Sequence, residues 1–156
     1  MLDEYQKRGG GLVYLHWGIE GGKDVKALTD RIGLAFSMSK FRHGPMKLTF
    51  TATKHPITEG FTSLDFLDES YWDLRGDPSA VSVLAESNEE GKPRPLLWVI
   101  ERGKGRVFAC IPGHYTWTLD DPLYRIIVLR GIAWAAQQPD VNRLTELALV
   151  GAAVPN

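Results

Sequence analysis

The chain has 156 residues, of which 44% are hydrophobic and 24% are charged, and its formal net charge is −1. This length corresponds to one domain, which we place at residues 1–140, followed by a C-terminal tail at 141–156. The near-zero net charge disfavours nucleic acid as a partner, and a single cysteine, Cys110, excludes an internal disulfide. No apolar run reaches the roughly 20 residues of a membrane span. We therefore expect no membrane partner and a cytoplasmic protein, or a periplasmic one if a signal peptide precedes Met1.

The first third of the chain has the pattern of an α/β fold. Residues 2–7 resemble the last turns of a helix, and the glycines that follow predict a short connection. Leu12–Leu15 is a continuous apolar run, which is typical of a parallel strand covered on both faces. Residues 23–36 carry apolar side chains at helical spacing and predict a surface helix. Residues 46–50 alternate between apolar and polar and predict a half-exposed strand.

The rest of the chain alternates strands and turns before a final helix. Residues 63–74 predict a strand or a pair of loops, with Asp68 and Glu69 at the bend. Further strands are predicted at 81–85, 96–101 and 106–111, with a solvated loop at 86–92 and an antiparallel hairpin between the last two strands. Asp121-Pro122 is a strong helix start, and the helix is predicted to run to about residue 138, buried against the sheet.

Two of the four histidines stand out as candidates for chemistry. His16 and His114 each follow a predicted strand and its turn, and in open α/β sheets ligands bind beyond the carboxyl ends of the strands. A single histidine is most often structural, and His55 before Pro56 fits a turn. The pair of His16 and His114, however, suits proton transfer or metal binding near neutral pH.

Carboxylates and a third histidine extend this candidate set. Asp68 and Glu69 are catalytic candidates as partners of the histidines, although composition alone favours a solvated bend. If Glu69 faces His16 and His114, these three residues can bind a divalent metal such as zinc. The spacing gives no support, because no HxxxH or HxH pair occurs. We expect His43 to contact the substrate or to complete a metal site.

Aromatic residues flank the candidate histidines. Trp17, Tyr115 and Trp117 form a candidate stacking surface for a sugar ring, although core packing would explain any one of them. Cys110 lies inside an apolar strand, and we assign it to the core as an inert thiol.

Several segments together resemble the ThuA-like (trehalose utilisation) family. They lie at residues 8–16, 55–61, 68–71, 95–98, 103–108, 113–114 and 131–135. The resemblance implies a flavodoxin-like three-layer α/β sandwich related to the class I glutamine amidotransferases. We expect its sheet to be mainly parallel, with one antiparallel hairpin. The resemblance also implies a role in carbohydrate metabolism.

The chain departs from that family pattern in two ways. Family members are usually longer and begin with a strand–helix–strand portion, so we expect a short form or a fragment. A second copy would then complete the sheet in a homo-oligomer. The amidotransferase relatives carry a cysteine at the elbow after the strand, where this chain has His16 between Leu15 and Trp17. Glutaminase chemistry through a thioester is therefore not expected.

From these residues and this resemblance we expect a protein that acts on a sugar or keto-sugar derivative. The chemistry would be acid–base catalysis by His16, His114 and a carboxylate, or metal-assisted catalysis, as in a hydrolase or an isomerase. The residues call for no cofactor other than, in the second case, a divalent ion such as zinc. The alternative is a non-catalytic carbohydrate-binding or assembly module of the same fold. An ester or lactone hydrolase lacks the GxSxG nucleophile motif.

Overall fold

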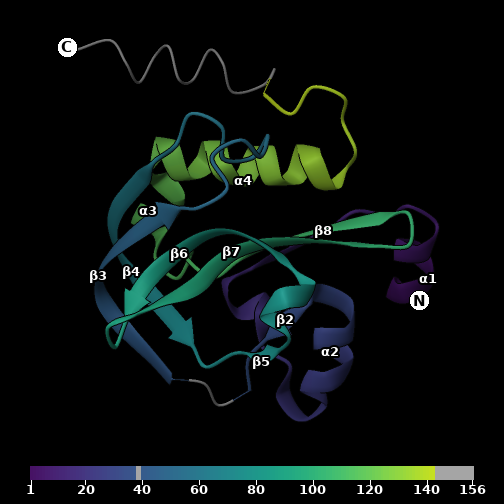
Figure 1. Cartoon of the computed structure of the whole chain (residues 1–156), viewed down its shortest axis with the longest axis horizontal. Coiled ribbons are helices and arrows are strands. Elements are labelled where there is room, and N and C mark those ends of the chain that lie inside the picture. Colours follow the sequence, from purple (N-terminus) through teal and green to yellow (C-terminus); the bar gives the residue numbers. More distant parts are fainter. Residues whose placement is uncertain (38–39, 143–156) are drawn as a thin grey trace.

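The computed structural model describes residues 1–37 and 40–142 (Figure 1). The helices in these ranges are α1 (Leu2–Lys7), α2 (Val25–Ile32), α3 (Thr116–Asp120) and α4 (Pro122–Ala135), with 3₁₀ turns η1 (His16–Ile19), η2 (Gly22–Asp24) and η3 (Pro78–Ala80). The strands are β1 (Leu12–Leu15), β2 (Leu34–Ala35), β3 (Lys40–Phe50), β4 (Ser63–Trp72), β5 (Arg75–Gly76), β6 (Ser82–Glu89), β7 (Lys92–Arg102) and β8 (Gly105–Cys110). The fold is therefore a mixed α/β structure.

The main sheet has the strand order β1-β8-β7-β6-β3-β4. Only the β1–β8 pair is parallel, and the other neighbours pair antiparallel. The expectation of a mainly parallel sheet is therefore wrong, because β6, β7 and β8 follow one another through turns too short for a parallel crossover. The predicted hairpin between the last two strands is confirmed as β7–β8. A second hairpin replaces the predicted loop at 86–92, with Glu90 and Gly91 both at positive φ, as a two-residue turn requires.

Three other predicted elements differ from the structure. The segment at 63–74 has no bend at Asp68 and Glu69, because β4 runs through both residues and pairs with β3 along its length. The predicted helix at 23–36 ends at Ile32, where Gly33 adopts a φ of 90° that breaks it. Finally, β1 is partly exposed rather than covered on both faces, because it lies at one edge of the sheet.

Helices lie on both sides of this sheet (Figure 1), with α4 against β8 and β1 and α2 against β7 and β8. The predicted start of α4 is confirmed: the Asp121 carboxylate accepts hydrogen bonds from the backbone N–H groups of Leu123 and Tyr124, both at 2.9 Å, and Pro122 begins the helix. The helix ends at Ala135, earlier than expected. Of the predicted tail at 141–156, residues 143–156 lie outside the described residues.

The sheet is strongly curled, and the curl brings its two edges together. In strand order β1 and β4 are the farthest apart, yet Nε2 of His16, directly after β1, lies 3.3 Å from a carboxylate oxygen of Glu69 on β4. The segment after β8 fills the junction, where the Trp117 indole N–H donates to the carbonyl of Leu67 on β4 at 2.8 Å. The candidate histidines and carboxylates meet at this junction. In the described part of the chain, no helix is long and apolar enough to cross a membrane.

Candidate active site

His16 is fixed by the turn that directly follows β1. The parallel register places Leu15 beside Cys110, so His16 and Ile111 leave the sheet together. His16 has a φ of 47°, the left-handed region that costs a non-glycine residue about 1 kcal/mol. This conformation turns the imidazole back over the sheet, where its Nδ1 lies 3.0 Å from the carbonyl oxygen of Ile111. Backbone strain of this kind is typical of functional sites.

Asp68 holds the segment that carries His114. Its carboxylate accepts hydrogen bonds from the backbone N–H groups of Gly113 and His114, both at 3.0 Å, and from that of Glu69 at 2.6 Å. The side chain has no exposed surface. Asp68 was predicted as a catalytic carboxylate; in the structure it binds backbone groups and joins the edge strand β4 to the segment after β8.

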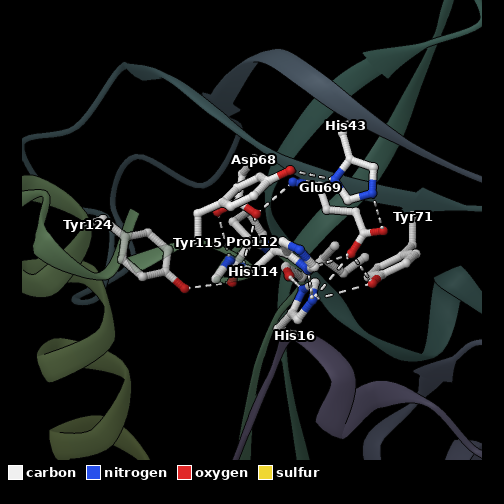
Figure 2. Close-up of polar contacts among 11 residues, drawn as sticks. His16, His43, Asp68, Glu69, Tyr71, Pro112, His114, Tyr115 and Tyr124 are labelled. Atoms are coloured by element: carbon white, nitrogen blue, oxygen red, sulfur yellow. Dashed lines mark hydrogen bonds and ion pairs between the residues drawn. The ribbon is translucent and has the colours of Figure 1, made fainter. Parts of the chain in front are cut away.

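Glu69 lies at the centre of the cluster in Figure 2. Its Oε2 atom is 3.3 Å from Nε2 of His16 and 3.0 Å from Nδ1 of His114, and its Oε1 atom is 3.2 Å from Nε2 of His43. His43 lies directly across from Glu69 in the register of β3 and β4, which explains why these two side chains meet. Glu69 is only 5% exposed. The structure thus brings together His16, His114 and Glu69, as the proposed set required, and adds His43.

Sequence reasoning missed Tyr71 as a member of the cluster. Tyr71 follows Glu69 by two residues on β4, so both side chains lie on one face of the strand. Its hydroxyl donates a hydrogen bond to Oε2 of Glu69 and lies 3.4 Å from Nε2 of His16. Burial, and next the Glu69 carboxylate, raise the pKa of the Tyr71 hydroxyl well above its usual range. Two-residue periodicity would have revealed Tyr71 if β4 had been predicted as one strand.

The hydrogen bond to Ile111 determines which ring nitrogen of His16 carries a hydrogen. A carbonyl oxygen only accepts, so Nδ1 of His16 must carry a hydrogen toward Ile111. In a neutral ring Nε2 then presents a lone pair, and this nitrogen lies 3.1 Å from Nδ1 of His114 and 3.4 Å from the hydroxyl of Tyr71. The Glu69 carboxylate lies 3.3 Å from the same nitrogen.

The three central donor atoms also satisfy the distances of a metal site. Nε2 of His16, Nδ1 of His114 and Oε2 of Glu69 are 3.0 to 3.3 Å apart. A zinc ion with bonds of about 2.0 to 2.2 Å can contact three atoms at such separations from one side, which leaves further positions open. The hydrogen bond from His16 to a backbone carbonyl is the usual outer contact of a metal-bound histidine. The residues present therefore fit a divalent ion.

The predicted aromatic residues lie around this cluster. The hydroxyl of Tyr115 is 2.8 Å from Nδ1 of His43. The rings of Tyr115 and Trp117 are stacked, with centroids 4.1 Å apart and planes 14° apart. The ring of Trp17 packs edge to face near that of Tyr71, with centroids 6.3 Å apart. Tyr115 and Trp17 thus each lie beside a residue that contacts Glu69, namely His43 and Tyr71. Trp117 joins them by stacking on Tyr115.

Cys110 and His55 lie outside the cluster. The assignment of Cys110 to the core is confirmed, because the side chain has no exposed surface and burial raises the pKa of its thiol to about 12. His55 follows β3 and packs against the ring of Trp134, with centroids 5.4 Å apart. Its Nδ1 accepts a hydrogen bond from the backbone N–H of Ile57 at 3.2 Å.

We expect the folded protein to lose stability in mild acid because of His55. Burial lowers the pKa of its imidazole, and the positive charge of Arg106 lowers it further. The unfolded chain therefore binds this proton at a higher pH than the folded protein does. The contribution of His55 to the free energy of unfolding is constant above a pH of about 6.5 and declines as the pH falls toward the folded-state pKa.

His55→Asn should remove this part of the decline, because its amide oxygen can still accept from Ile57. Urea unfolding of both proteins at several pH values measures the difference, and identical pH profiles would contradict it.

A comparison with family models matches residues 1–135 to the family ThuA, described as trehalose utilisation. The chain belongs to the ThuA family. The resemblance noted in the sequence is thus confirmed over most of the chain. A search among curated proteins found no match.

Solved structures agree with this ThuA assignment at the level of fold. A ThuA-like protein from Parabacteroides merdae ATCC 43184 matches with a TM-score of 0.71 and 21% identity, over 85% of this chain and 62% of that one. A ThuA-like protein from Bacteroides uniformis ATCC 8492 matches with a TM-score of 0.72 and 17% identity, over 88% and 62%. The chain thus spans less than two thirds of the length of these structures. A β-galactosidase from Bacillus circulans sp. alkalophilus matches with a TM-score of 0.59 and 13% identity, over 92% of this chain and 20% of that enzyme.

Proposed function

We propose that this ThuA domain acts on a sugar or keto-sugar derivative through metal-assisted acid–base chemistry, as a hydrolase or an isomerase, at the cluster around Glu69. The observation that carries the proposal is the donor set formed by Nε2 of His16, Nδ1 of His114 and Oε2 of the buried Glu69, which lie 3.0 to 3.3 Å from one another. Two imidazoles and one carboxylate at such distances suit zinc. The family description, trehalose utilisation, supports a carbohydrate as the substrate.

In this proposal His16, His114 and Glu69 hold the ion, which when bound would polarise a carbonyl or hydroxyl oxygen of the substrate. His43 contacts the other oxygen of Glu69, and its side chain is 44% exposed. It can therefore reach a bound sugar and move a proton to or from it. The hydroxyl of Tyr115 fixes the orientation of the His43 ring from the opposite nitrogen. Tyr71 fixes the Glu69 carboxylate by its hydrogen bond.

The test combines metal content with turnover. Purified protein is analysed for bound metal, titrated with zinc, and assayed on a panel of sugars and keto-sugar derivatives. His16→Ala and His114→Ala, made separately, should each lose zinc binding and turnover, whereas His55→Asn should retain both because His55 lies outside the cluster. Parent-like zinc affinity and turnover in both alanine variants would overturn the proposal. Turnover that needs the two histidines but no metal would leave acid–base chemistry by His16 and His114 without an ion.

A non-catalytic module of the same fold is the competing function. The match to one fifth of a β-galactosidase chain favours it, since there the fold is one part of a larger enzyme. Such a module would bind carbohydrate without turnover, and its binding would be indifferent to chelators.

A further inference from the structure

Two tryptophans beside the cluster are held in place although they are largely exposed. Trp17 is 63% exposed and Trp117 is 54% exposed. The indole N–H of Trp117 donates to the carbonyl of Leu67 at 2.8 Å, and its ring stacks on Tyr115. Trp17 meets Phe36 edge to face, with centroids 5.6 Å apart and planes 74° apart. The hydrogen bond and the stacking hold the Trp117 ring in place, and Trp17 presents an apolar surface that packs on Phe36. Such surfaces bind a ring at a reduced cost in conformational entropy.

The two tryptophans contact tyrosines that lie on opposite sides of the cluster. Figure 2 shows Tyr115 and Tyr71 on opposite sides of the group formed by His16, Glu69 and His114. Trp117 stacks on Tyr115, whereas Trp17 contacts Tyr71 with centroids 6.3 Å apart. A ligand whose reacting group reaches Glu69 can therefore meet one aromatic surface on each side.

A further exposed ring lies on the Trp17 side. Phe41 is 58% exposed, and its ring centroid is 6.4 Å from that of Tyr71. Exposed aromatic side chains are thus concentrated on both sides of the polar cluster. The apolar C–H faces of sugar rings, and aryl groups attached to sugars, pack on such surfaces.

We propose that Trp17 forms a second ring-binding subsite, separate from the one at Tyr115 and Trp117, and that it determines specificity for the group on the far side of the reacting sugar. The ligand class is a glycoside with a ring on each side of the cluster. Tyr115 and Trp117 bind the ring that presents its hydroxyl or carbonyl group to the cluster. This inference rests on the proposed function, because it assumes a carbohydrate ligand.

The test compares two ligands that differ only in the second ring. Methyl and phenyl glucosides of the same anomeric form are titrated calorimetrically into the zinc-loaded full chain. The parent should bind the phenyl glucoside about tenfold more tightly, as expected for one aromatic contact. Trp17→Ala should abolish this preference and leave the affinity for the methyl glucoside within about twofold. Trp117→Ala should weaken both ligands equally.

Controls separate this inference from a general loss of structure. Leu129→Ala removes an exposed apolar side chain on α4 and should leave both affinities unchanged, and Trp17→Phe should retain part of the preference. Thermal unfolding checks that each variant is folded. An unchanged preference in Trp17→Ala, or equal weakening of both ligands, would overturn the subsite while leaving the proposed function intact. Absence of binding by either glucoside to the parent would overturn the subsite, whereas the proposed function is decided separately by zinc affinity and turnover in His16→Ala and His114→Ala.

Discussion

Asp68→Ala is expected to lower the free energy of unfolding by about 3 kcal/mol. Each buried donor left without an acceptor costs about 1–3 kcal/mol. The total stays at about 3 kcal/mol because water can enter the space left by the side chain and accept from part of these donors. The Asp68 carboxylate accepts from three backbone N–H groups, those of Gly113, His114 and Glu69. It is fully buried, so solvent cannot replace it in the intact fold. Its loss also frees the segment that carries His114, so zinc affinity should fall together with stability.

Asp65→Ala is the matched control, because Asp65 is an exposed aspartate on the same strand, β4. It should change the free energy of unfolding by less than about 0.5 kcal/mol. Urea denaturation followed by tryptophan fluorescence measures both variants. Equal stability of the two would contradict the role of Asp68 in joining β4 to the segment after β8.

Glu69→Gln is expected to abolish turnover and to weaken zinc binding by more than about 100-fold. Loss of an outer hydrogen-bond partner of a metal ligand typically costs 10- to 100-fold in affinity, and Glu69 would be a ligand itself. The change removes the negative charge that contacts three imidazoles at 3.0 to 3.3 Å, yet it preserves the size of the side chain. Stability should therefore change less than it does in Asp68→Ala.

Tyr71→Phe and Asp65→Asn are the two comparison variants, and both should weaken zinc binding less than Glu69→Gln does. Tyr71→Phe removes the hydroxyl that donates to Glu69 and lies 3.4 Å from Nε2 of His16, but it removes no ligand, so zinc affinity should fall by about 10- to 100-fold. Asp65→Asn removes an exposed charge from the same strand and should have no effect. Zinc titration against a competing chelator gives the three affinities. If Glu69→Gln bound zinc as tightly as Asp65→Asn does, Glu69 would not be a ligand.

Elements with strong local signals could be predicted from the sequence. The apolar run of β1, the cap and proline at the start of α4, and the short turn between β7 and β8 all depend on neighbouring residues alone. The strand β4 could not be read in this way. Its buried residues 68–70 are polar, and a run of polar residues suggests a loop. Asp68 and Glu69 are buried because they contact groups from other parts of the chain.

The candidate site shows the same division. His16 and His114 were identified because each follows a strand and a turn, and Glu69 was named on the condition that it faced them. Nothing local indicated that this condition is met. It depends on the curl of the sheet, which brings β4 to the end of β1 although these strands are opposite edges. Tyr71 was missed for a different reason: Glu69 was placed at a bend, so its shared strand face with Tyr71 was not recognised.

The sequence by itself determined the family, the α/β class and the core position of Cys110, and it named His16 and His114 as candidates, because each depends on local pattern or composition. Only the tertiary structure decided that the sheet is mostly antiparallel, that Asp68 binds backbone while Glu69 contacts imidazoles, and that His43 and Tyr71 join them. The contacts of Glu69 with His16 and His114, and of Asp68 with the segment after β8, join residues far apart in the chain, so no local pattern in the sequence could reveal them.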